Sequence, residues 1–264
     1  MNRHTLHSLQ AMKAAGEKIA ALTCYDASFA RMLDGAAVDV ALVGDSLGMV
    51  VQGRDSTLAV TLEDMVYHTA CVARGLTRAL LVADLPFASY QVSPPQAYRS
   101  AARLMAAGAH MVKLEGGAVM AETVAFLVQR GIPVCAHLGL LPQSVHQLGG
   151  YRVQGRDEAG ARQLLEDARM LEEAGAGLVV LEAMPAALAA EISRALTIPT
   201  IGIGAGPGCD GQVLVLYDAL GLYAQPPRFA KNFLVQGGDL RAAVAEYVRQ
   251  VKAGEFPDAG HTLA

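Results

Sequence analysis

Residues 38–46 read VDVALVGDS, an apolar and β-branched run that ends in a glycine, an aspartate and a serine. Similar runs recur, and they predict eight strands, at 19–23, 38–43, 79–83, 110–114, 132–136, 178–181, 199–203 and 213–216. Stretches with helical signals separate most of them. Dividing 264 residues by eight leaves about 33 per unit, the size of a strand with its crossover helix. The pattern predicts an α/β protein with a parallel sheet, and eight strands favour a closed (β/α)8 TIM barrel over an open doubly wound sheet.

Helix boundaries support this division of the chain. Ser93 with Gln96, and Thr61 with Asp64, have the spacing of capping boxes at the start of two predicted helices. No linker, low-complexity tract or internal repeat interrupts the pattern. We therefore expect residues 1–264 to form a single barrel domain that begins with a short N-terminal helical segment.

Composition excludes several classes of function. The 21 Lys and Arg residues against 25 Asp and Glu residues leave a net charge of -4, which offers nucleic acid no broad basic surface. There is no secretory peptide pattern and no apolar run of membrane-spanning length, so no membrane association is expected. Four cysteines without a CxxC pair suit a reducing compartment, and we expect a cytoplasmic protein. Only 17% of residues are charged, which leaves neutral surface and predicts a homo-oligomer.

Polar side chains stand where the predicted strands end, and in a barrel these ends converge on one mouth. They are Asp45, Asp84, Lys113, Glu115, His137 and Glu182. Taken singly, each has an ordinary structural interpretation: a turn-forming aspartate, a buried ion pair or a hydrogen-bonded core histidine. Their joint placement favours a functional site, because buried charges are costly unless they are paired or bind a metal.

Three of these residues, Asp45, Asp84 and Glu115, supply carboxylates without a His-Cys cluster nearby. Carboxylate oxygens are preferred by hard cations, so the sequence favours Mg²⁺, with several waters retained. Alternation along a strand places Lys113 and Glu115 on one face.

A glycine-rich stretch, IGIGAGPGCDG at 201–211, contains a GxGxxG spacing. A dinucleotide-binding motif would require a following helix and an acidic residue about 20 positions later, and neither is evident. We expect the glycines to permit tight loops beside a ligand, with phosphate binding as the lesser alternative.

Five segments at these positions resemble the ketopantoate hydroxymethyltransferase family. They are VGDSLGMVVQGRDST at 43–57, DLPF at 84–87, VKLEGG at 112–117, residues 137–155 with GGYRVQGR at 149–156, and IGIGAG at 201–206. The resemblance runs from about the N-terminal helix to Phe256. It implies a barrel of the phosphoenolpyruvate/pyruvate type, a homodecamer, and a step of pantothenate (coenzyme A precursor) biosynthesis. In that step 5,10-methylenetetrahydrofolate donates a hydroxymethyl unit to 3-methyl-2-oxobutanoate, giving 2-dehydropantoate and tetrahydrofolate.

The resemblance also implies roles for individual residues. Asp45 and Asp84 match Mg²⁺ ligands, with Glu115 completing the metal site directly or through water. The oxo acid would be bound by Asp45, Ser46, Asp84 and Lys113, and Glu182 matches the proton acceptor. From its position, His137 is expected to orient the substrate or a proton-carrying water.

Three alternatives stay open at the level of sequence. The chain could be a Mg²⁺-dependent carbon–carbon lyase or mutase acting on another 2-oxo acid, which folate dependence would separate. Lys113 could form a Schiff base with the substrate, which borohydride would trap. The chain could also be a non-catalytic metabolite-binding barrel, which substrate binding without turnover would reveal.

Overall fold

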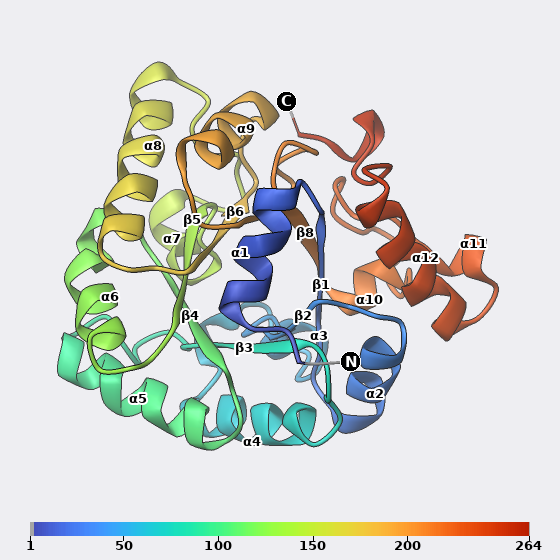
Figure 1. Cartoon of the computed structure of the whole chain (residues 1–264), viewed down its shortest axis with the longest axis horizontal. Helices are drawn as coiled ribbons and strands as arrows, with labels where there is room; N and C mark the ends of the chain where they lie inside the picture. Colours follow the sequence, from blue (N-terminus) through green and yellow to red (C-terminus); the bar gives the residue numbers. More distant parts are fainter. Residues whose placement is uncertain (1–2, 264) are drawn as a thin grey trace.

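Eight parallel strands close into a barrel in which each strand pairs with the next in sequence and β8 pairs with β1 (Figure 1). The computed structural model describes residues 3–263, without the side chains of residues 236 and 237. The strands are β1 (Ile19–Thr23), β2 (Val40–Val43), β3 (Leu80–Asp84), β4 (Met111–Glu115), β5 (Val134–Gly139), β6 (Leu178–Glu182), β7 (Thr200–Ile203) and β8 (Gly211–Leu214). All eight predicted strands, and the predicted TIM barrel, are therefore confirmed. The eighth lies two residues earlier than predicted, because Leu216 already begins a short helix.

Seven longer helices surround the barrel. They are α2 (Ala27–Gly35), α4 (Leu62–Ala73), α5 (Pro94–Ala106), α6 (Ala121–Val128), α8 (Glu158–Glu173), α9 (Ala186–Ala195) and α12 (Leu240–Lys252). Helix α5 illustrates how they pack, because Ala97, Ala101 and Leu104 recur at helical spacing and are buried. Shorter helices are α3 (Leu47–Val50), α7 (Val145–Leu148), α10 (Leu216–Ala219) and α11 (Leu234–Gly237). Within residues 3–263, no helix has the length and apolarity that crossing a bilayer requires.

The two predicted capping boxes have different outcomes. At α4, Thr61 and Asp64 exchange hydrogen bonds as predicted. At α5, the Ser93 side chain accepts from the Gln96 N–H, but the reciprocal bond is absent and that part of the prediction is wrong. The Gln96 side chain instead accepts from Val92 N–H at 3.1 Å and donates to the Ala88 carbonyl at 2.8 Å. It thereby closes the loop before the helix.

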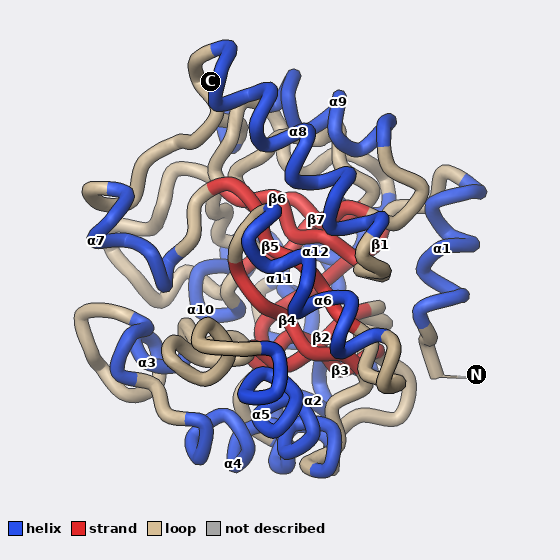
Figure 2. Tube along the Cα trace, turned by 90° about the vertical axis from the view of Figure 1, so that its left-hand side faces the viewer, coloured by secondary structure: helices blue, strands red, loops and turns tan. Residues whose placement is uncertain are grey.

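The first helix, α1 (Leu6–Ala15), covers one end of the barrel. Its Leu9 and Met12 join the apolar residues inside the barrel, which include Ile19, Met111 and Leu178. Figure 2 shows α1 at one end of the barrel and α3 and α7 at the opposite end. Helix α1 therefore excludes water from the end where the strands begin, and the carboxyl ends of the strands remain for a site.

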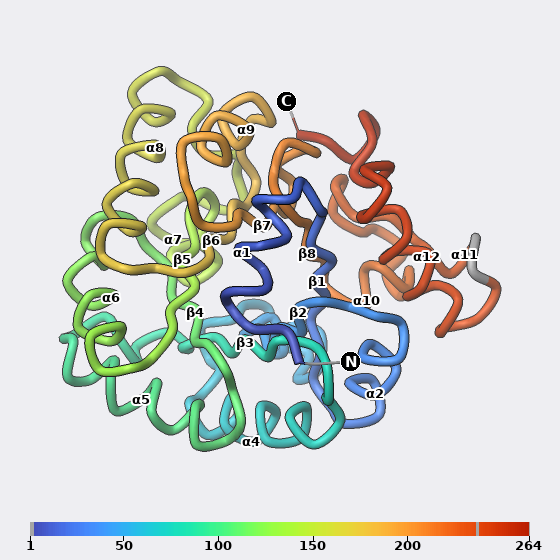
Figure 3. The backbone as a smooth tube through the Cα atoms, in the orientation of Figure 1, coloured from blue at the N-terminus to red at the C-terminus, as the bar shows by residue number. Residues whose placement is uncertain are grey.

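The seam between β8 and β1 is covered by the C-terminal part of the chain. Figure 3 shows the chain passing from β8 through α10 and α11 to α12, which lies along β1. The buried Tyr247 hydroxyl of α12 lies 2.8 Å from the Ala21 carbonyl of β1 and 2.9 Å from the Gln212 carbonyl of β8. One side chain thus ties both seam strands to the helix.

At the closed end, Asp39 is 2% exposed and gathers several partners. Its carboxylate accepts a bond from Ala20 N–H at 2.8 Å, pairs with Lys252, and lies 3.3 Å from the His4 ring. Burial by itself raises the pKa of Asp39, but the contacts with His4 and Lys252 outweigh it and the pKa lies below its usual value. Asp39 therefore joins the N-terminal segment, β1 and α12 through one buried charge.

Replacing Asp39 with asparagine is expected to lower the free energy of unfolding by about 3 kcal/mol at pH 7, because it removes one partner of buried ionic contacts. A depressed folded-state pKa stabilises the fold above the unfolded pKa of about 4, and the contribution disappears as the pH falls through the folded value. Urea unfolding at pH 7 and pH 3 measures both effects. A difference from wild type that is the same at both pH values would contradict the ionic account.

Candidate active site

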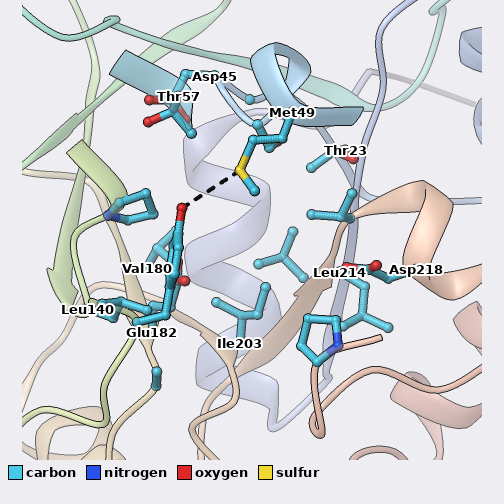
Figure 4. A pocket seen from close by; sticks show the side chains of 18 of the residues that line it. Thr23, Asp45, Met49, Thr57, Leu140, Val180, Glu182, Ile203, Leu214 and Asp218 are labelled. Atoms are coloured by element: carbon cyan, nitrogen blue, oxygen red, sulfur yellow. Dashed lines mark hydrogen bonds between the residues drawn. The ribbon is translucent and has the colours of Figure 1, made fainter. Parts of the chain in front are cut away.

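A cavity of about 640 Å³ opens at the carboxyl ends of the strands. All seven site residues predicted from the sequence line it: Asp45, Ser46, Asp84, Lys113, Glu115, His137 and Glu182. Figure 4 shows part of the wall, with Asp45 and Glu182 among the labelled side chains. The structure therefore brings these residues into one cavity, whereas their individual roles stay predictions.

Strand register places these side chains next to one another. Asp84, the last residue of β3, stands beside Lys113 of β4, and Glu115 stands beside His137 of β5. Lys113 and Glu115 both face the cavity, as their spacing predicted. Adjacent parallel strands thus assemble acidic and basic groups in alternation at the mouth.

Asp84 connects the loop after β2 to β4. One of its carboxylate oxygens accepts from Asp45 N–H at 3.1 Å, and the other lies 3.2 Å from the Lys113 ammonium nitrogen. Gly44 belongs to this geometry, because a Cβ at that position would lie 2.8 Å from the Ser46 hydroxyl oxygen. Ser46 in turn shares a 2.8 Å hydrogen bond with Tyr25. The glycine therefore lets both Asp45 and Ser46 stay on the cavity wall.

The carboxylates of Asp45 and Asp84 both have raised pKa values. Burial, followed by repulsion from Asp84 and Glu115, raises the pKa of Asp45 to about 8. Burial likewise raises the pKa of Asp84 in spite of Lys113. Although burial opposes it, the pKa of Lys113 is raised by Asp84, Glu115 and Asp45, so this side chain is an ammonium. In this buried cluster the three carboxylates of Asp45, Asp84 and Glu115 outnumber the cationic side chains of Lys113 and His137.

His137 lies between two glutamates. Its Nδ1 is 3.5 Å from Glu115 and its Nε2 is 3.2 Å from Glu182. Burial and the nearby Lys113 lower the pKa of His137. The two carboxylates raise it by more, so that the pKa is about 9. The imidazolium form accounts for both carboxylate contacts. The Lys113 nitrogen lies 3.2 Å from His137 Nδ1 and 3.2 Å from the Asp84 carboxylate, with which it forms an ion pair.

Glu182 is placed by an unusual stretch of backbone. The following residue, Ala183, has φ +45°, a left-handed conformation that is strained for a residue with a Cβ. On the neighbouring strand, Gly139 has φ +95°, and a Cβ there would lie 2.1 Å from the Glu182 carbonyl oxygen. The close approach lets Leu140 N–H donate to that carbonyl at 2.9 Å. The end of β6, and with it Glu182, is held firmly against β5.

Gln143 is a site residue that sequence reasoning missed. Its side-chain amide donates to Asp45 at 2.8 Å, and its backbone N–H donates to Glu115 at 3.0 Å. The Tyr90 hydroxyl fixes the amide by donating to its oxygen at 2.7 Å. Gln143 lies in the segment between β5 and α8, and nothing in the neighbouring sequence singles out this residue.

The glycine-rich stretch contributes packing. A Cβ at Gly206 or Gly208 would lie 2.5 Å from Ala186 or Ala190 of α9, and one at Gly211 would lie 2.4 Å from the Ile19 carbonyl oxygen. None of these three glycines lines the cavity at the mouth. They permit close contact with α9 and β1, and the expectation that they lie in loops beside a ligand stays a prediction.

The donor set suits a divalent cation. Two buried oxygens, Oδ1 of Asp84 and Oε1 of Glu115, lack a well-oriented hydrogen bond among the described residues, although cationic groups lie 3.2 Å and 3.5 Å away. The Asp45–Asp84 pair fits an oxygen-preferring ion that keeps several waters. Among residues 3–263, no three His, Cys, Asp or Glu side chains form a metal-binding group by themselves. The metal assignment of Asp45, Asp84 and Glu115 therefore stays a prediction.

Comparison with known proteins shows which family this chain belongs to. The family model described as ketopantoate hydroxymethyltransferase matches residues 3–259. A protein from Thiobacillus denitrificans, named 3-methyl-2-oxobutanoate hydroxymethyltransferase, is 68% identical over 98% of this chain and 99% of its own length. A protein of the same name from Nitrosospira multiformis is 61% identical over 99% of this chain and its full length.

Solved structures with a similar fold are more distant in sequence. Phosphonopyruvate hydrolase superposes with a TM-score of 0.64 at 12% identity, over 84% of each chain. A 2,3-dimethylmalate lyase, described as a member of the PEP mutase/isocitrate lyase superfamily, gives 0.58 at 18% identity over 82% of each chain. These likenesses confirm the barrel fold.

Proposed function

Because the chain belongs to the ketopantoate hydroxymethyltransferase family, whose named relatives are enzymes, we propose that it moves a one-carbon unit from 5,10-methylenetetrahydrofolate to 3-methyl-2-oxobutanoate. The product is 2-dehydropantoate, for pantothenate biosynthesis. One observation carries the proposal: a buried carboxylate pair beside Lys113 shares its cavity with the firmly held Glu182. This arrangement suits proton abstraction beside a ketone.

Substrate binding is assigned to the Asp45–Asp84–Lys113 side of the cavity. Mg²⁺ held by Asp45 and Asp84, with Glu115 directly or through water, would supply Lewis-acid stabilisation of an enolate. Lys113 adds positive charge for the oxo acid's oxygens, and the Ser46 hydroxyl is the adjacent hydrogen-bond donor. Gln143 restrains Asp45 and Glu115 in this geometry.

Proton transfer is assigned to Glu182. Its carboxylate removes the proton from C3 of the oxo acid. The electron pair of the carbon–hydrogen bond stays on the substrate, which becomes the enolate. His137, 3.2 Å from the Glu182 carboxylate, holds it toward the cavity. The enolate carbon then forms a bond to the folate-borne methylene carbon, and water supplies the hydroxyl. The two carbon–nitrogen bonds of the methylene break, and the folate nitrogens take up the proton held by Glu182 and the proton released by water, which gives tetrahydrofolate.

Exchange of the C3 proton tests the first half of this chemistry. In D₂O, the proton signal of 3-methyl-2-oxobutanoate should disappear when enzyme and Mg²⁺ are present and persist when EDTA replaces Mg²⁺, because an unstabilised enolate is several kcal/mol less accessible. Proton NMR measures the loss. Exchange that survives EDTA would remove the metal from the proposal, and absence of exchange even with tetrahydrofolate added would point to another substrate or a binding role.

The Schiff-base alternative is disfavoured by the surroundings of Lys113. Its nitrogen is buried, contacts Asp84 at 3.2 Å and is held in the charged form by three carboxylates, whereas imine formation requires a neutral amine. Borohydride with the oxo acid is therefore expected to trap no adduct on Lys113.

A cytoplasmic homodecamer completes the proposal. The family resemblance supports that assembly, and exposed apolar side chains are available for subunit contacts. Val92 is 80% exposed and Val119 is 81% exposed.

A further inference from the structure

Asp218 is a further carboxylate of the cavity, and Figure 4 shows it remote from Asp45. The figure shows it beside Leu214, on the side of the cavity opposite Glu182, with its oxygens directed inward. Only 8% of its surface is exposed. Within the described part of the chain, its carboxylate makes no hydrogen bond or ion pair, and burial raises its pKa to about 6.

The backbone holds this side chain in place. Asp218 lies in α10, four residues beyond the end of β8. Its own N–H donates to the Val215 carbonyl at 3.0 Å, and the first residue of the helix, Leu216, donates to the Thr23 hydroxyl at 2.9 Å. An unpartnered buried carboxylate on a fixed backbone costs stability, as is common for groups reserved for a ligand.

The surroundings of Asp218 indicate the chemistry of that ligand. Val215, Pro227 and Phe229 line the same cavity and provide apolar surface. A planar ring that presents N–H groups along one edge would satisfy the carboxylate and pack on this wall. The oxo acid does not fit, because its carboxylate and ketone only accept hydrogen bonds and would be repelled.

We propose that Asp218 binds the N3–H and 2-amino groups of the pterin ring of the folate cosubstrate, with one hydrogen bond to each carboxylate oxygen. This assignment rests on the proposed function, in which tetrahydrofolate carries the one-carbon unit. It makes Asp218 a cosubstrate-binding residue on the wall across from the proton acceptor. The reacting methylene would then lie between the pterin on one side and the oxo acid on the other.

Binding of tetrahydrofolate, measured by calorimetry in the presence of EDTA, tests the proposal. Asp218→Asn should raise the Kd by about 10- to 100-fold, since it removes a charge-assisted pair of hydrogen bonds. Wild type should also prefer tetrahydrofolate over its 2-desamino-2-methyl analogue by about tenfold, and Asp218→Asn should bind both alike. Asp55→Asn, an exposed change beside Arg54, is the charge-matched control and should retain both properties.

The outcomes separate this inference from the proposed function. Metal-dependent exchange of the C3 proton should be retained by Asp218→Asn, and its thermal midpoint should equal or exceed that of wild type. An unchanged Kd, or a raised Kd with the preference between the two ligands intact, would overturn the role of Asp218 alone. A wild-type protein that neither binds tetrahydrofolate nor turns over with its methylene form would overturn the proposed function as well.

Discussion

Exchange of Glu182 for glutamine is expected to lower kcat by roughly a thousandfold, because a carboxamide of the same shape cannot accept the C3 proton. Affinity for the oxo acid should stay within about threefold of wild type, since the group acts in the transition state rather than in substrate binding. The rate of C3 proton exchange in D₂O isolates this step from one-carbon transfer. Steady-state kinetics then give kcat and KM separately.

The matched control is Glu173→Gln, which makes the same chemical change at an exposed position of α8. It should leave the exchange rate unchanged. Exchange at the wild-type rate in Glu182→Gln would remove Glu182 as the proton acceptor. The acceptor would then have to be another carboxylate that lines the same cavity.

A second large effect is expected from Asp84→Asn. The substitution retains the shape of the side chain but removes a proposed metal ligand and the ionic partner of Lys113. The Mg²⁺ concentration that gives half-maximal proton exchange should rise by at least about 100-fold, more than is usual for groups that only support a ligand. KM for the oxo acid should rise with it, because substrate and cation are proposed to share one site.

Titrating exchange activity with Mg²⁺ at several oxo-acid concentrations tests this coupling. Asp55→Asn is again the control, and its two affinities should match those of wild type. If Asp84→Asn weakened Mg²⁺ without affecting the oxo acid, or the reverse, the shared site would be refuted. Unchanged values for both would remove Asp84 from the metal site altogether.

The barrel and the membership of its mouth could be predicted from the sequence. Apolar runs of strand length alternate with capped helices, and the pattern of neighbouring residues in each segment predicts its secondary structure. Polar residues that directly follow these runs lie at the carboxyl ends of parallel strands, which converge at one end of the barrel. Asp84 and Glu182 could therefore be predicted as site residues from the sequence. Period-two alternation likewise placed Lys113 and Glu115 on one face.

Other features required the tertiary structure, because they join residues that carry no shared local pattern. Gln143 donates to Asp45 across 98 positions of sequence, and a glutamine in a loop looks the same whether it meets solvent or a buried carboxylate. Asp218 resembles any aspartate in a short helix until closure of the barrel buries it against an apolar wall. Gln96 had the right spacing for a capping box, yet its side-chain oxygen accepts from the Val92 N–H instead of the Ser93 N–H. Secondary structure depends on adjacent residues and can be predicted from them. Burial and long-range hydrogen bonds arise only when the strands close around a common interior.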